Sequence, residues 1–244
     1  MSNIRLVIEY VGARYHGWQR QSTLPTLQGV LEDCIHKICG EKIKLIGAGR
    51  TDAGVHALGQ VANFKTGSAL KSQTWRRALN ALLPEDIVIL KAQEVSDTFH
   101  ARRSAKSKTY QYRILNRRTH SAILGPMSWH VPLSLNLRAM RTAAKPLVGH
   151  HDFRSFCGKA CTAKTTHARL LRLSIQCQQD LILITVNGTN FLQHMVRNIV
   201  GTLVQVGIGK LSPERMCGIL EAKDRRRAGP TAPPHGLFLV RVNY

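Results

Sequence analysis

The chain has 244 residues, which is enough for one large domain or for two of roughly 100–150 residues each. It carries 35 Lys and Arg against 14 Asp and Glu, a formal charge of +21. A protein that binds a neutral small molecule has no need for so large a positive charge. The charge favours a polyanionic partner, because phosphates neutralised by Lys and Arg release their counterions. A membrane is the other anionic candidate, but no stretch reaches the roughly 20 apolar residues of a spanning helix, and residues 1–10 lack a signal-peptide core. We therefore expect a cytoplasmic protein that binds nucleic acid and no membrane.

The first half of the chain mixes short strands with helices. Apolar residues alternate with more polar ones over residues 4–10, which is typical of a strand, and they recur at helical spacing over residues 26–38. Further strands are predicted at 43–46, 60–64 and 87–95. A second helix is predicted at 73–83, where Pro84 ends it.

Residues 99–108 are dense in Arg and Lys and separate this half from a second one. The pattern there predicts strands at 109–115, 168–177, 180–187 and 237–242, and helices at 137–148, 191–206 and from Pro213 to about 222. Gln178 and Gln179 between two strands indicate a hairpin. Strands that often follow one another without a crossover favour an α+β fold with a largely antiparallel sheet. We expect two similar halves, residues 1–105 and 106–244.

Six cysteines lie at positions 34, 39, 157, 161, 177 and 217, and none forms a C-x-x-C pair. Cys157 and Cys161 could join His150, His151 and His167 in a zinc site. The interpretation we favour is free thiols and no metal.

The segment from Gly47 to Gly59 is the most constrained in the chain, with glycines at 47, 49, 54 and 59. Glycine permits turns and close approaches that other residues do not. One interpretation is a structural loop with an Arg50–Asp52 ion pair. A dinucleotide loop is the other, but the spacing is not G-x-G-x-x-G and a strand follows instead of a helix, so no helix N-terminus is available for a pyrophosphate.

Residues 49–61, GRTDAGVHALGQV, closely resemble the signature of the tRNA pseudouridine synthases of the anticodon stem-loop, the TruA family. The resemblance extends from about residue 4 to residue 244. Further segments that resemble the family are YVGARYHGWQRQ at 10–21, FHAR at 99–102, KTYQY at 108–112, GHHDF at 149–153, HMVRNIVG at 194–201 and AGPTAP at 228–233. The family usually has an Asp where this chain has Val11, which puts one local loop contact in doubt.

The resemblance implies the pseudouridine synthase fold, with a mainly antiparallel sheet and a central basic cleft between the two halves. It also implies a homodimer that modifies uridines at positions 38, 39 and 40, with Asp52 as the catalytic nucleophile. The reaction breaks the N1–C1′ bond, turns the base and joins C5 to C1′, so nothing is added or oxidised. No cofactor is therefore expected. The base must leave its stack to reach the carboxylate.

Four further residues are assigned to substrate binding by the same resemblance. Arg197 supplies the cation that an ionised carboxylate needs in a partly dry pocket. Tyr110 stacks on the flipped uracil, although a tyrosine in a strand is more often ordinary packing. Arg50 fills the space that the base leaves or holds a phosphate, and Leu237 lines the uracil pocket or packs in the core.

Arg197 belongs to a polar strip of the predicted helix, formed with Asn190, His194, Asn198 and Gly201. A solvated helix face is the alternative interpretation of this strip.

Basic clusters are expected to follow the tRNA backbone. They comprise Arg102, Arg103, Lys106 and Lys108; Arg117 and Arg118; Lys159 and Lys164; and residues 223–227. Two rival functions remain open. A non-catalytic RNA-binding protein on the same fold would share this surface without needing Asp52, and an enzyme with a nucleotide cofactor would use the glycine loop.

Overall fold

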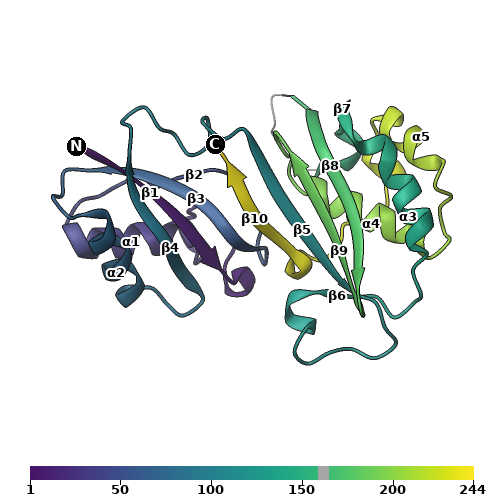
Figure 1. Cartoon of the computed structure of the whole chain (residues 1–244), viewed down its shortest axis with the longest axis horizontal. Coiled ribbons are helices and arrows are strands. Elements are labelled where there is room, and N and C mark those ends of the chain that lie inside the picture. The colour runs from purple at the N-terminus through teal and green to yellow at the C-terminus, as the bar shows by residue number, and fades with distance from the viewer. Residues whose placement is uncertain (159–164) are drawn as a thin grey trace. The chain divides into compact units, whose positions relative to one another are not determined.

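The computed structural model describes residues 1–158 and 165–244. The chain forms two compact units, residues Met1–Lys106 with Leu239–Tyr244, and residues Ser107–Phe238 (Figure 1). The closing strand β10 (Leu237–Asn243) therefore begins in the second unit and continues in the first.

The first unit is an antiparallel sheet with two helices. Its strands lie in the order β4-β1-β3-β10, and the short β2 pairs with β3. Leu6, fully buried, lies opposite Ala62 of β3 and Ala92 of β4. The elements are β1 (Ser2–Tyr10), α1 (Leu27–Cys39), β2 (Ile46–Gly47), β3 (His56–Thr66), α2 (Ser72–Leu82) and β4 (Ile87–Val95).

Local chemistry sets the ends of both helices. The Thr26 hydroxyl caps α1 by accepting a hydrogen bond from the Gly29 N–H (3.3 Å), and Gly40 ends the helix at φ 73°. Trp75 of α2 packs edge-on against Phe64 of β3, with ring centroids 5.1 Å apart, which places α2 on this sheet. Both predicted helices are thus confirmed to within one residue at each end.

In the second unit the strands β5, β9, β8 and β7 pair antiparallel in this order, and the short β6 pairs in parallel with β5. α3 packs against α4, where Gly207 leaves room for the Met140 side chain. The elements are β5 (Ser107–Leu115), β6 (Trp129–His130), α3 (Leu137–Ala144), β7 (Gly149–Asp152), β8 (His167–Gln178), β9 (Leu181–Gly188), α4 (Met195–Gly207) and α5 (Arg215–Ala222).

Short 3-10 helices connect these elements, at Gly12–Arg14, Gly125–Met127, Lys145–Leu147, Arg154–Phe156, Arg225–Arg227 and Pro234–Gly236. None of the described helices is long and apolar enough to cross a membrane.

The predicted α+β class and antiparallel pairing are confirmed, and so is the hairpin, where Gln178 pairs with Leu181 and Gln179 turns at φ 54°. The helix predicted at 191–206 begins later, because His194 has φ 60°, which no helix interior accepts. The helix predicted at 137–148 ends at Ala144, and Pro146 lies in a separate 3-10 turn.

Two predictions in the first half need correction. The strand predicted at 43–46 is wrong except at its end, since only Ile46 and Gly47 pair. β3 begins at His56, inside the expected loop, because Ala57 already pairs with Tyr10.

Candidate active site

The loop over residues 47–59 is fastened to the sheet of the first unit. At its start Gly47 lies in β2 opposite Ala62 of β3. The Gln60 side-chain amide donates a hydrogen bond back to the Gly49 carbonyl (2.8 Å). The backbone that leads to Asp52 is therefore held from both ends.

The segment after β1 supports this loop from one side. The hydroxyls of Tyr10 and Thr51 are hydrogen-bonded at 2.8 Å, and the backbone N–H of Trp18 donates to the Thr51 carbonyl (3.0 Å). The Trp18 indole also lies directly on Gly47, where a Cβ would stand 2.6 Å from its Nε1. Gly17 turns beneath Thr51 at φ 87°, a conformation that favours glycine.

A second set of contacts follows Asp52. Its carbonyl accepts the Val55 N–H (3.2 Å), closing a turn in which Gly54 has φ 77°. The Gly12 N–H donates to Nδ1 of the buried His56 (3.1 Å), and a Cβ on Gly12 would overlap the Val55 carbonyl oxygen. Asp52 thus sits at the centre of a loop whose backbone has little freedom.

Asp52 itself is half-buried, whereas Arg50 is exposed. Within residues 1–158 and 165–244, the Arg50 side chain makes no hydrogen bond or ion pair. The interpretation of the loop as a structural Arg50–Asp52 pair is therefore not supported.

In the second unit, Tyr110 lies on β5 opposite Val186 and is 7% exposed. Its ring meets the edge of Phe191 at 71°, with centroids 4.9 Å apart. A tyrosine packed in the core would make the same contact with a neighbouring ring.

Arg197, in the first turn of α4, is hydrogen-bonded to the loop that precedes β10. Its Nε donates to the Ala232 carbonyl (2.8 Å), and the Ala232 N–H donates to the Arg197 carbonyl (3.1 Å). Asn198 is fully buried. One turn further, a Cβ on Gly201 would overlap the Pro230 carbonyl oxygen. At Arg197, Asn198 and Gly201 the polar strip is therefore covered by this loop and is not a solvated face, whereas Asn190 precedes α4 and is exposed.

Tyr112, two residues after Tyr110, lies close to Arg197. Burial raises the pKa of Tyr112 well above its usual value, and the positive charge of Arg197 offsets part of that rise. The Tyr112 hydroxyl donates to the Pro233 carbonyl (2.8 Å), and Gly236 packs on its ring. Leu237, 5% exposed, follows directly.

The structure thus places Asp52 and Arg50 in the first unit, and Tyr110, Arg197 and Leu237 in the second. Sequence reasoning assigned no role to Thr51 or Asn198, although both stand beside a predicted site residue. Thr51 is hydrogen-bonded to Tyr10 and Asn198 to Thr231, and no pattern of sequence spacing predicts either pair. Their place inside the family-like segments is the signal that could have marked them.

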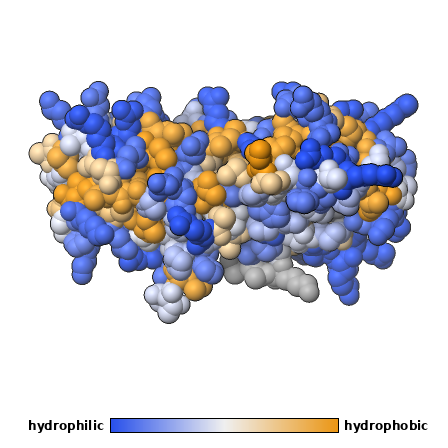
Figure 2. All heavy atoms as spheres, turned by 90° about the horizontal axis from the view of Figure 1, so that it is seen from below, coloured by the Kyte–Doolittle hydropathy of each residue, from blue (hydrophilic) through white to orange (hydrophobic). Residues whose placement is uncertain are grey.

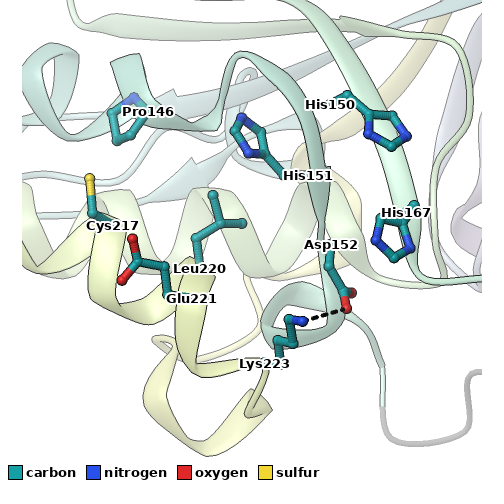
Figure 3. A pocket seen from close by; sticks show the side chains of 9 residues that line it. All are labelled: Pro146, His150, His151, Asp152, His167, Cys217, Leu220, Glu221 and Lys223. Atoms are coloured by element: carbon teal, nitrogen blue, oxygen red, sulfur yellow. Dashed lines mark ion pairs between the residues drawn. The ribbon is translucent and has the colours of Figure 1, made fainter.

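A pocket of about 520 Å³ lies in the second unit, between β7 and α5 (Figure 3). His150 and His167 stack beside it with centroids 5.6 Å apart. The Lys223 ammonium and the Asp152 carboxylate are 3.8 Å apart. None of the five predicted site residues lines this pocket.

A neighbouring pocket of about 450 Å³ shares Lys223 and has a strongly basic lining, with Arg154, Arg225 and Arg226 beside the single carboxylate Asp224. Asp224 already binds Arg226 (2.8 Å). Burial lowers the pKa of Arg225, whose guanidinium donates to neighbouring oxygens. The Arg154 guanidinium has no hydrogen bond or ion pair to any described residue, so this pocket offers a cation to an incoming phosphate.

The interpretation of all cysteines as free thiols is wrong at Cys157, which is disulfide-bonded. Cys161 lies outside the described residues, and the free cysteines among those described are Cys34, Cys39, Cys177 and Cys217. In the described part of the chain, no three His, Cys, Asp or Glu side chains are placed to hold a metal ion.

The predicted basic clusters differ in their surroundings. Arg102 and Arg103 are exposed, whereas Arg117 is bound to Asp180 (3.2 Å). Lys159 and Lys164 lie outside the described residues. On the face shown in Figure 2, hydrophobic areas alternate with hydrophilic side chains.

Comparison with known proteins gives one consistent family. A family model described as tRNA pseudouridine synthase matches residues 6–102 and 143–244. Proteins named tRNA pseudouridine synthase A are 46% identical over the full length of both chains in Thermoanaerobacter sp. (strain X514) and in Acetivibrio thermocellus (strain ATCC 27405). The namesake from Myxococcus xanthus is 43% identical over 100% of this chain and 92% of its own.

Among solved structures, a chain of a Cbf5-Nop10-Gar1 complex is 13% identical, with a TM-score of 0.41. The match covers 97% of the present chain and spans about half (48%) of the length of the other.

Proposed function

Because this chain belongs to the tRNA pseudouridine synthase family, we propose that it converts uridine to pseudouridine at positions 38, 39 and 40 of the anticodon stem-loop, with Asp52 as nucleophile. The observation that carries the proposal is the loop around Asp52. It lies inside the matched residues 6–102, and hydrogen bonds and glycine contacts hold its backbone on both sides of the carboxylate.

The reaction is an isomerisation, so its atoms balance without a co-reactant. The N1–C1′ bond breaks, the C5–C1′ bond forms, and the proton lost from C5 is balanced by the one that N1 gains. Asp52 attacks C1′ of the ribose, attacks the base, or drives elimination through the sugar, and its carboxylate is regenerated at the end of the cycle. The carboxylate must be ionised to act, which requires a nearby cation in a partly dry site.

We assign that cation to Arg197. Its side chain is suited to the task because a guanidinium stays charged at all working pH values. The bond from Nε to Ala232 also fixes the plane of the group (2.8 Å). The assignment rests on the family-like segment HMVRNIVG and on this fixed orientation.

Three further residues complete the substrate site in this proposal. Tyr110 stacks on the flipped uracil, since every base presents an aromatic face. Leu237 lines the uracil pocket. Arg50, exposed and unpaired among the described residues, takes the space that the base leaves or holds a phosphate.

The partner is tRNA, held mainly by phosphate contacts because a structured stem-loop is recognised largely by shape and backbone. The formal charge of +21 and the basic pocket at Arg154 support this. We further propose that the protein works in the cytoplasm as a homodimer.

The test compares the purified wild-type protein with Asp52→Asn, which keeps the size of the side chain and removes its charge. Pseudouridine at positions 38–40 is mapped in unmodified tRNA under single-turnover conditions. We expect Asp52→Asn to lose on the order of 10³-fold or more of the rate, with tRNA affinity retained. Equal modification by both proteins would exclude Asp52 as nucleophile, and no modification by the wild type would favour a non-catalytic RNA-binding protein.

A further inference from the structure

Asn198 of α4 is fully buried and joins three segments that are far apart in the sequence. Its Nδ2 donates to the Phe156 carbonyl (2.8 Å). Its Oδ1 accepts from the Thr231 hydroxyl (2.6 Å) and from Nη2 of Arg225 (3.0 Å). Because a buried amide costs free energy unless it is satisfied, this set of bonds favours one arrangement of the surrounding chain.

The same side of α4 holds the loop at two more points. The Thr202 hydroxyl donates to the Asn198 carbonyl (2.7 Å) and accepts from the Gly229 N–H (2.9 Å). At Gly201 a Cβ would overlap the Pro230 carbonyl oxygen, so the loop backbone lies directly on the helix backbone. No flexible side chain separates the two.

The end of this loop holds Arg197. Ala232 follows Thr231 directly, and it makes two bonds to Arg197, one through its carbonyl to Nε (2.8 Å) and one through its N–H to the Arg197 carbonyl (3.1 Å). The position of the Ala232 carbonyl therefore depends on where Asn198 anchors Thr231. That carbonyl in turn sets the plane of the guanidinium.

We propose that Asn198 and Thr231 are positioning residues, which orient Arg197 for the reaction without touching the substrate. This inference rests on the proposed role of Arg197. The competing view is that Asn198 only stabilises the fold. The two views differ in whether loss of the Thr231 bond acts through Arg197.

Thr231 is the better position to vary, because it is exposed and Thr231→Val removes only a hydroxyl. Misplacing a group by about 1 Å can cost up to ~100-fold in rate. We expect Thr231→Val to slow single-turnover pseudouridine formation roughly 10-fold, with tRNA affinity within about twofold of the wild type. Thr231→Ser keeps a donor and should restore the rate. Leu203→Ala, a core change in the same helix, should lower the melting temperature without this loss.

A double-mutant cycle separates the two views. Lys has no Nε–H to donate to the Ala232 carbonyl, so Arg197→Lys removes the side-chain bond to the loop and leaves the backbone bond in place. We expect Thr231→Val to add little further slowing in that background. Equal slowing in both backgrounds would overturn the inference.

Hydrogen exchange at the Arg197 Nε–H gives a second measurement that needs no activity. In protein labelled with ¹⁵N-arginine, this resonance is assigned by its loss in Arg197→Lys. Exchange should be faster in Thr231→Val than in Thr231→Ser, and equal exchange rates would contradict the inference.

The reaction rates distinguish a failure of this inference from a failure of the proposed function. A wild-type rate of pseudouridine formation in Arg197→Lys would refute the proposed role of Arg197 itself. A slow Arg197→Lys with a normal Thr231→Val would refute only the positioning role.

Discussion

The phenol oxygen of Tyr10 and the hydroxyl oxygen of Thr51 lie 2.8 Å apart, with both residues buried, which ties the neighbour of Asp52 to the end of β1. Burial raises the pKa of Tyr10, and hydrogen bonds with Thr51 and Gln60 lower it only in part. The phenol therefore stays protonated at all working pH values and keeps its donor.

Removing either hydroxyl leaves a buried partner short of a hydrogen bond. We expect Thr51→Val and Tyr10→Phe each to lower the free energy of unfolding by about 1–3 kcal/mol. The double variant should cost less than the sum, because it leaves no unsatisfied hydroxyl in the pair. Urea unfolding measures all three. Strict additivity would contradict this coupling.

Gly12→Ala should displace the loop that carries Asp52, because the new methyl would overlap the Val55 carbonyl oxygen. We expect a loss of about 1–3 kcal/mol in stability and a larger proportional loss of turnover. Gly218→Ala is the matched control, since it lies within α5 with no atom near the new methyl, and it should stabilise by about 0.5–1 kcal/mol. The prediction is wrong if the two variants behave alike in unfolding and turnover assays.

Asp152 should make stability depend on pH. Burial opposes ionisation of its carboxyl, but bonds from the Thr166 hydroxyl and the Arg154 N–H, with the charges of Arg154 and His167, hold its pKa below the usual value. A lowered native pKa adds stability above the unfolded pKa, about 3.9, and loses it as the pH falls through the native value. The melting temperature of Asp152→Asn should therefore be lower than that of the wild type, and this difference should be largest at pH 7 and smallest below about pH 4. A gap that stays constant with pH would refute this.

Arg154→Ala should weaken tRNA binding in a salt-dependent way. If its guanidinium neutralises one phosphate, the slope of log K against log salt should fall by about 1. Arg117→Ala serves as control, since Arg117 is already bound to Asp180 (3.2 Å). Filter binding at several salt concentrations gives both slopes. Equal slopes for Arg154→Ala and the wild type would remove Arg154 from the phosphate contacts.

Much of the local structure was predictable because it depends on neighbours in the sequence. Thr26 and Gly40 bracket α1, and the turn at Gln179 joins two alternating strands. The glycines mark the segment around Asp52 as conformationally constrained, whereas the catalytic role proposed for it comes from the resemblance to the TruA family.

The contacts that support the candidate site were not predictable, because they depend on tertiary structure. Asn198 reads as part of a polar helix face, yet Thr231, more than 30 residues away, covers it. His194 carries no signal for the positive φ that delays the start of α4. Periodicity describes one element at a time, and it gives no information on which distant loop will lie on a helix.

The path of β10 has a consequence for dividing this protein. Residues Leu239–Tyr244 belong to the unit formed by Met1–Lys106, and Gly59 of β3 accommodates the Val240 carbonyl at close range. A fragment cut after Lys106 would leave one edge of β3 with bare N–H and carbonyl groups, which invites aggregation. Supplying the last six residues through a linker after Lys106 should keep this edge of β3 paired in such a fragment.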